Sequence, residues 1–221
     1  VSKKYKLIIL SDEIYSQLTF SDRYRSISNF YPERTIVSTG LSKWCGAGGW
    51  RLGFFAIPNQ LGELKNSLKI LCSESFTSVS APIQYAAVEA YRGDHSAYLN
   101  SIKKILLLAG TYVYENLISN TINVTKPDGG FYLMPEFTNA KFSSSSKMCK
   151  DILNKTGVAL LPGSDFGLNS NKMLARLSYT DFDGNNFLNN TSGSKKLDDS
   201  DLRKYAPNIV EGVIKLKEWS N

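Results

Sequence analysis

Short apolar runs alternate with helical patterns along the first half of the chain, and this alternation constrains the fold most. The runs cover Lys6 to Leu10, Thr35 to Val37 and Leu52 to Ile57. They are rich in β-branched and aromatic residues, which is typical of strands, and the first run indicates a strand buried on both faces. Helical patterns follow over Leu61 to Ile70 and Ala81 to Tyr91. Strands that alternate with helices predict an α/β sheet.

The second half of the chain has a different pattern. It opens with an amphipathic helix over Ser96 to Leu117, whose length suits a bridge between domains. Short strands, a Pro-Asp-Gly-Gly turn, a helix ending at Gly157 and a last helix from about Pro207 to Trp219 follow, which predicts a small α+β domain. We therefore divide the chain into residues 1–110 and 111–221. The polar, Asn-rich stretch 184–200 is interpreted as an exposed insertion.

Composition excludes several classes of protein. The chain has 221 residues, of which 42% are hydrophobic, and a net charge of +6. Its basic residues are scattered without a long Lys/Arg run, so we expect no nucleic-acid partner. The longest apolar stretch is around Ile105 to Ala109, far short of a membrane span. Three cysteines without metal-ligand spacing predict neither a zinc site nor a disulfide framework. With no signal peptide visible, we expect a reducing, cytoplasmic compartment.

Four polar side chains lie next to the ends of the predicted strands. Asp12 and Tyr15 come after the first run, Lys43 after the second, and Arg51 just before the third. Taken singly, each has a structural interpretation as a helix cap, a solvated amine or a surface ion pair. Ligands of open α/β sheets bind at strand ends, however, and all four side chains fall at one edge of the sheet. A lysine can form a Schiff base and an aspartate can pair with a pyridinium nitrogen, so the set indicates pyridoxal phosphate.

At these residues the sequence resembles the fold type I pyridoxal-phosphate enzymes, and within them the class I and II aminotransferases. The resemblance rests on Asp12 and Tyr15, on Ser42-Lys43 and on Gly49-Trp50-Arg51-Leu52-Gly53, in order and at the family's spacing. Three further motifs extend it towards the C-terminus: Pro127-Asp128-Gly129-Gly130-Phe131-Tyr132, Pro162-Gly163-Ser164-Asp165-Phe166-Gly167 and Arg176-Leu177-Ser178-Tyr179.

The resemblance implies a role for each candidate. Lys43 would hold the cofactor covalently and then move the substrate's α-proton. Asp12, as a buried carboxylate, would keep the ring nitrogen protonated, Tyr15 would hydrogen-bond the phenolic oxygen, and Arg51 would bind the phosphate. Arg176 would grip the α-carboxylate of the substrate; its structural alternative is a salt-bridged strand arginine. His95, the only histidine, is interpreted as a surface loop residue.

The resemblance also implies an architecture. The chain would be the C-terminal part of a large cofactor domain, with a mixed, mostly parallel sheet, joined to the small C-terminal domain. Family members are about twice as long, so this chain would be the C-terminal half of a homodimeric enzyme acting on an amino acid and a 2-oxo acid. We expect the intact parent to be active, and the isolated chain to bind cofactor weakly and turn over little.

Two positions depart from the family pattern. Gly40 stands where many members carry a serine that holds the phosphate, and Thr39 or Ser38 is a weak substitute. No arginine occurs near Phe76 to Ser78, where dicarboxylate-specific members bind the substrate side chain. Two alternatives remain open: a fold type I lyase, such as a carbon-sulfur β-lyase or an aminocyclopropane-carboxylate-synthase-like enzyme, and a non-catalytic cofactor-binding domain.

Overall fold

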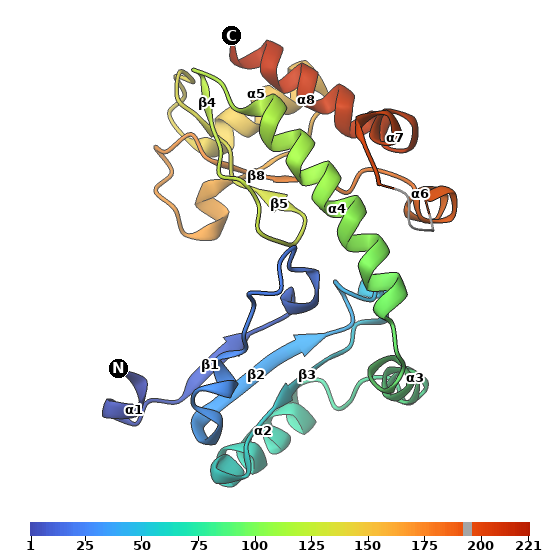
Figure 1. The fold of residues 1–221 in the computed structure, drawn as a ribbon. Helices are drawn as coiled ribbons and strands as arrows, with labels where there is room; N and C mark the ends of the chain where they lie inside the picture. Colours follow the sequence, from blue (N-terminus) through green and yellow to red (C-terminus); the bar gives the residue numbers. More distant parts are fainter. Residues whose placement is uncertain (192–195) are drawn as a thin grey trace. The chain divides into compact units, whose positions relative to one another are not determined.

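The computed structural model describes residues 1–191 and 196–221, and these form two compact units, Val1–Leu99 and Asn100–Asn221. The division falls near the start of helix α4 (Ser96–Leu117), whereas the sequence placed the boundary at residue 110. Helix α4 has the bounds that its amphipathic pattern predicted (Figure 1). Its buried side chains, from Ile105 to Leu117, all belong to the second unit.

The first unit is built on a three-stranded sheet in the order β1-β2-β3 (Figure 1). Strand β1 is parallel to β2, and β3 is antiparallel to it, so the sheet is mixed, with one pairing of each kind. The strands and helices of this unit are β1 (Ile9–Asp12), β2 (Thr35–Gly40), β3 (Gly53–Ala56), α1 (Ser2–Tyr5), α2 (Gly62–Ser75) and α3 (Ala81–Arg92). Short 3-10 turns connect several of them.

Strand β1 differs from its prediction in position and in burial. It begins at Ile9 rather than Lys6, because residues 2–5 form a short helix that ends with Lys6 in the left-handed region (φ 51°). The expectation of burial on both faces is wrong: Leu10 is 64% exposed. An apolar strand is buried on both faces only when other layers cover both sides of its sheet. Within the described residues, β1 is an edge strand, and Phe54 and Phe55 of β3 are exposed as well.

The second unit has the small α+β arrangement that the sequence predicted. Its pairings are β4 with β6, and β5-β8-β7 in a second sheet. Helix α8 buries an apolar face that includes Ile209, Val213 and Leu216. The strands and helices that follow α4 are β4 (Ile122–Asn123), β5 (Tyr132–Leu133), β6 (Glu136–Phe137), α5 (Ser145–Thr156), β7 (Leu161–Pro162), β8 (Ala175–Ser178), α6 (Gly184–Thr191), α7 (Asp199–Tyr205) and α8 (Pro207–Ser220).

The stretch 184–200 is not simply an exposed insertion. Residues 184–191 form helix α6, and its Phe187 is fully buried, 5.5 Å from the ring of Phe182 and 5.3 Å from the ring of Tyr205. Residues 192–195 of the stretch lie outside the described residues. The polar composition misled the interpretation because one aromatic side chain is enough to anchor a short helix to the core.

Tyr179 fixes the strand that carries Arg176. Its buried hydroxyl donates a hydrogen bond to the carbonyl oxygen of Gly130 at 3.0 Å. Gly110 of α4 lies so close that a Cβ there would be 2.9 Å from the Tyr179 hydroxyl oxygen. Burial raises the pKa of Tyr179 well above its ordinary value, so the hydroxyl stays a donor. The end of β8, the Gly-Gly turn and α4 are therefore held together at one point.

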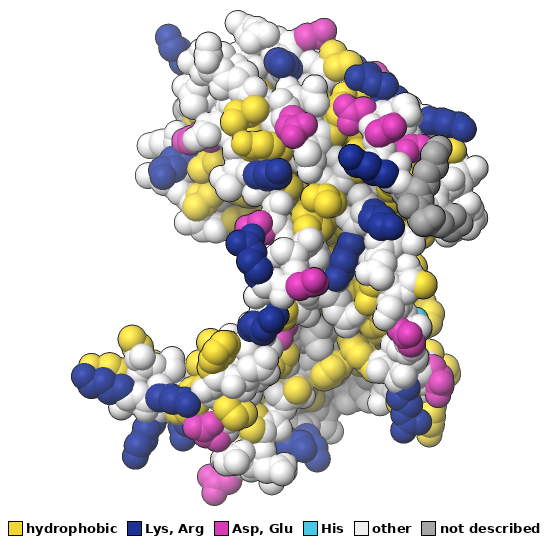
Figure 2. All heavy atoms as spheres, in the orientation of Figure 1, with side chains coloured by type: hydrophobic (Ala, Val, Ile, Leu, Met, Phe, Trp, Pro, Cys, Tyr) yellow, Lys and Arg dark blue, Asp and Glu magenta, His cyan; other side chains and the backbone are white. Residues whose placement is uncertain are grey.

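On the face in Figure 2, Lys and Arg side chains are scattered and Asp and Glu lie among them. Across residues 1–191 and 196–221, no helix is long and apolar enough to cross a membrane. The same residues contain no group of three or more His, Cys, Asp or Glu side chains that could hold a metal ion.

Candidate functional site

The candidate residues of the first unit lie at one edge of its sheet. Because β1 and β2 are parallel, Asp12 at the end of β1 pairs with Ser38 near the end of β2. Strand β3 is antiparallel, so its first residue, Gly53, pairs with the last residue of β2, Gly40. The loop that contains Lys43 and Arg51 runs from Gly40 to Gly53 and therefore begins and ends at this edge. We refer to this edge of the sheet, with the residues beside it, as the strand-end edge.

Lys43 and Tyr15 meet at the strand-end edge. The Lys43 Nζ atom lies 5.7 Å from the centroid of the Tyr15 ring, and both side chains are half-buried. Tyr15 is positioned by the 3-10 turn Ser16–Leu18, where the Leu18 N–H donates to the Tyr15 carbonyl at 2.9 Å. An amine over an aromatic face is held by the ring's quadrupole. This geometry keeps the amine beside the phenol.

Asp12 is exposed, which differs from the buried carboxylate that the sequence led us to expect. Its Oδ1 accepts a hydrogen bond from the Ile14 N–H at 3.3 Å. The difference has the same origin as the exposure of Leu10, since the strand that both residues share is an edge strand within the described residues.

Glu13 is a residue of this edge that sequence reasoning missed. Its carboxylate accepts hydrogen bonds from the hydroxyls of Ser11, at 3.0 Å, and Ser26, at 2.7 Å. Burial, with the nearby Glu13 carboxylate as the second cause, raises the pKa of Tyr24 to about 12. Glu13 therefore ties the segment after Tyr15 back to the strand end. The adjacent Asp12-Glu13 pair was its only signal in the sequence.

Arg51 is exposed and is held by its backbone and by one hydrogen bond. It adopts the left-handed conformation (φ 54°), and its Nη1 donates to the Gly48 carbonyl at 2.8 Å. The neighbouring strands approach closely: a Cβ on Gly40 would lie 2.7 Å from the Leu52 carbonyl oxygen. The glycine at position 40 is therefore required by the contact between β2 and β3, which explains why the expected serine is missing.

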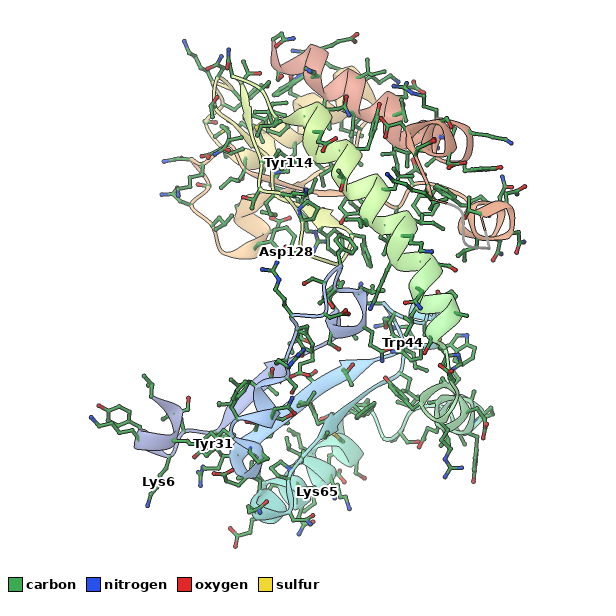
Figure 3. The ribbon with its side chains drawn as sticks, viewed as in Figure 1. Lys6, Tyr31, Trp44, Lys65, Tyr114 and Asp128 are labelled. Atoms are coloured by element: carbon green, nitrogen blue, oxygen red, sulfur yellow. The ribbon has the colours of Figure 1, made fainter. Side chains whose placement is uncertain are left out.

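Trp44, next to Lys43, is buried in an aromatic cluster. Its ring centroid lies 5.7 Å from that of Tyr91 and 5.7 Å from that of His95, beside the start of α4 (Figure 3). His95 lies in the loop between α3 and α4, as the sequence predicted, but it is half-buried and its Nε2 is inaccessible to solvent. This cluster supports the loop that carries Lys43.

Arg176 lies in the second unit, on the central strand β8, where it pairs with Leu161. The carbon Cζ of its guanidinium is 4.3 Å from the ring centroid of Tyr132 and 4.4 Å from that of Phe166. The three side chains belong to the three C-terminal motifs of the sequence, which the fold brings together here. In the part of the chain that the structure describes, Arg176 has no salt-bridge partner, so the alternative of a salt-bridged strand arginine is not supported.

Comparison with known proteins identifies the family of this chain. A family model described as aminotransferase class I and II matches residues 1–186. The chain is 36% identical over 167 residues to a probable N-acetyl-LL-diaminopimelate aminotransferase of Bacillus subtilis, covering 74% of this chain and 40% of that protein. It is 31% identical over 188 residues to an aspartate aminotransferase of Bacillus sp. (strain YM-2), covering 81% and 46%.

Solved structures agree with this result. An alanine aminotransferase from Pyrococcus furiosus has a TM-score of 0.76 at 25% identity, over 99% of this chain and 50% of that one. An aromatic aminotransferase from Pyrococcus horikoshii has a TM-score of 0.76 at 26% identity, over 99% and 52%. The chain thus spans about half the length of the relatives it matches. It belongs to the class I and II aminotransferase family.

Proposed function

We propose that this chain carries part of the active site of a pyridoxal-phosphate-dependent aminotransferase, which moves an amino group between an amino acid and a 2-oxo acid. The observation that carries the proposal is the Lys43 Nζ atom, 5.7 Å from the Tyr15 ring centroid at the strand-end edge. Membership of the family supports the reaction type. The named relatives differ in their amino acid, so the substrate is proposed only as a class.

The side chains at the strand-end edge fit pyridoxal phosphate in their chemistry. The edge combines an amine, a phenol, a carboxylate and a guanidinium, which match an aldehyde, a phenolic oxygen, a ring nitrogen and a phosphate. Arg51 is exposed and uses Nη1 in a hydrogen bond to the Gly48 carbonyl, so other N–H donors of its guanidinium remain for a phosphate. When bound, the cofactor supplies an electron-withdrawing ring that weakens the bond to the substrate's α-hydrogen.

Each residue then has a defined task. Lys43 would hold the cofactor covalently through its Nζ atom, and its amine, once freed by the incoming amino acid, would take the substrate's α-proton and return it. The Tyr15 hydroxyl would donate a hydrogen bond to the phenolic oxygen of the cofactor, and Asp12 would accept one from the ring nitrogen. Because Asp12 is exposed, this pairing becomes strong only if the bound ring keeps water away from it. Arg176 binds the substrate carboxylate with two parallel N–H donors.

Covalent labelling tests the cofactor site. The chain is titrated with pyridoxal phosphate, reduced with borohydride and digested for peptide mass mapping. We expect the label on Lys43 and its loss in Lys43→Ala, whereas Lys65→Ala, which removes an exposed lysine of α2, leaves the labelling of Lys43 unchanged. Labels distributed over the exposed lysines, with no preference for Lys43, would overturn the assignment.

Product analysis tests the reaction. The loaded protein is mixed with L-alanine or with L-cysteine, and 2-oxo acid and ammonia are both measured. Transamination yields the 2-oxo acid while the amino group stays on the cofactor. Release of ammonia with pyruvate from L-cysteine would instead identify a lyase. Homodimer formation and a cytoplasmic location remain predictions of the sequence.

A further inference from the structure

The surroundings of Arg176 are unusual for an arginine in a strand. Two aromatic rings from different elements, Tyr132 of β5 and Phe166 of the 3-10 turn Gly163–Phe166, lie within 4.4 Å of its Cζ atom. Both distances are well inside the range in which a ring attracts a cation. Strand β8 is paired on both sides, with β5 and with β7, so the backbone of Arg176 is also held.

The charge of Arg176 has no counterion in the described part of the chain. The side chain is half-buried, no salt bridge to it is present, and neither of the contacting rings carries a negative charge. A partly desolvated cation is costly unless an anion or a π-face compensates it. The two rings supply part of that compensation and leave the N–H donors of the guanidinium without a carboxylate partner. This arrangement is typical of an arginine that binds an anionic ligand.

We propose that Tyr132 and Phe166 are positioning residues that cover the faces of the Arg176 guanidinium, so that only the donors in its plane are offered to a ligand. The inference rests on the proposed function, in which Arg176 binds the substrate carboxylate. It adds that the two rings determine which shape of anion Arg176 accepts. A planar carboxylate meets the guanidinium edge with two parallel, coplanar hydrogen bonds. A tetrahedral anion of the same charge places oxygens out of that plane, towards the rings. The pair therefore selects carboxylates over sulfonates.

The test measures binding at Arg176 itself and needs neither cofactor nor activity. The Arg176 side-chain N–H signal is assigned in the NMR spectrum by its loss in Arg176→Lys. It is then followed while acetate or methanesulfonate, both singly charged, is added to the 221-residue chain. In the wild type we expect acetate to shift the signal at lower concentration than methanesulfonate. Removing one ring, in Tyr132→Leu or Phe166→Leu, should weaken acetate binding about 2- to 5-fold.

The ratio of the acetate affinity to the methanesulfonate affinity distinguishes a positioning role from a general loss of structure. A variant that only loosens the fold weakens both anions alike, whereas loss of a positioning ring lowers the acetate-to-methanesulfonate preference. The conservative variants Tyr132→Phe and Phe166→Tyr keep a ring at each place and should retain the wild-type preference. An unchanged preference in both leucine variants, with acetate still shifting the signal, would overturn the positioning role and leave the proposed function standing. If acetate does not shift Arg176 in the wild type, the carboxylate role assigned to Arg176 falls, and this inference falls with it.

Discussion

Replacing Gly40 by serine puts back the residue that the family pattern led us to expect, and we predict that it destabilises the first unit. The new Cβ would lie 2.7 Å from the Leu52 carbonyl oxygen and 3.0 Å from the Gly53 Cα atom. Both are backbone atoms, Gly53 being the first residue of β3 and Leu52 the residue directly before it, so relief requires β2 and β3 to separate. Overpacking of this kind costs about 1–3 kcal/mol, and we expect Gly40→Ser to fall within that range.

Separation of the strands should appear in a specific hydrogen bond. The Leu41 N–H donates to the Leu52 carbonyl at 3.2 Å, the same oxygen that the new side chain would meet. Urea unfolding followed by circular dichroism measures the loss of stability, and hydrogen exchange of the Leu41 amide measures it locally. We expect faster exchange at Leu41 in the variant.

Gly62→Ser is the matched control for Gly40→Ser. Gly62 is the first residue of α2, and a Cβ there meets no atom within 4 Å, so the change should alter stability by no more than about 0.5 kcal/mol. If Gly40→Ser were as stable as Gly62→Ser, with unchanged exchange at Leu41, the steric explanation for Gly40 would be refuted.

Three further changes test the second unit, each read from urea unfolding. Phe187→Ala should cost about 3–5 kcal/mol, because the ring is fully buried; a truly exposed insertion would tolerate the change. Tyr179→Phe should cost about 1–2 kcal/mol, because the Gly130 carbonyl loses its donor. The Trp219 N–H and a nearby lysine hold the pKa of Asp151 below its ordinary 3.8, so its contribution is present above pH 3.8 and is lost as pH falls through the lowered value. The stability difference between wild type and Asp151→Asn should therefore shrink in acid, and a constant difference would contradict this origin.

Features that depend on local sequence were predictable. Helix α4 has its predicted bounds because an apolar stripe over 22 residues specifies a helix without help from distant segments. Gly157 likewise ends α5 in the left-handed conformation (φ 74°), as a glycine at that place predicts. The strand-end edge followed from the rule that parallel strands present their carboxyl ends together.

Features that depend on contacts between segments distant in the sequence were not predictable. Leu10 looked like a core residue because an apolar strand implies cover on both faces, and a sequence does not state whether that cover is present. Phe187 was hidden in a polar stretch, since its partners lie before and after it in the chain. The rings against Arg176 come from positions 44 and 10 residues earlier, so their contact with its guanidinium appears only in three dimensions.

The two halves of the proposed chemistry can be tested separately, because each is a property of one unit. Lys43 and Tyr15 contact each other within residues 1–99, and Arg176 contacts its two rings within residues 100–221. Covalent labelling of Lys43 is read without reference to Arg176, and the shift of the Arg176 signal by acetate is read without cofactor. If Lys43 is labelled but acetate does not shift the Arg176 signal, the protein still binds the cofactor, and the proposed binding of an amino-acid carboxylate by Arg176 is wrong. The reverse result would keep a carboxylate-binding site and would show that the 221-residue chain, which spans about half the length of its relatives, does not hold the cofactor by itself.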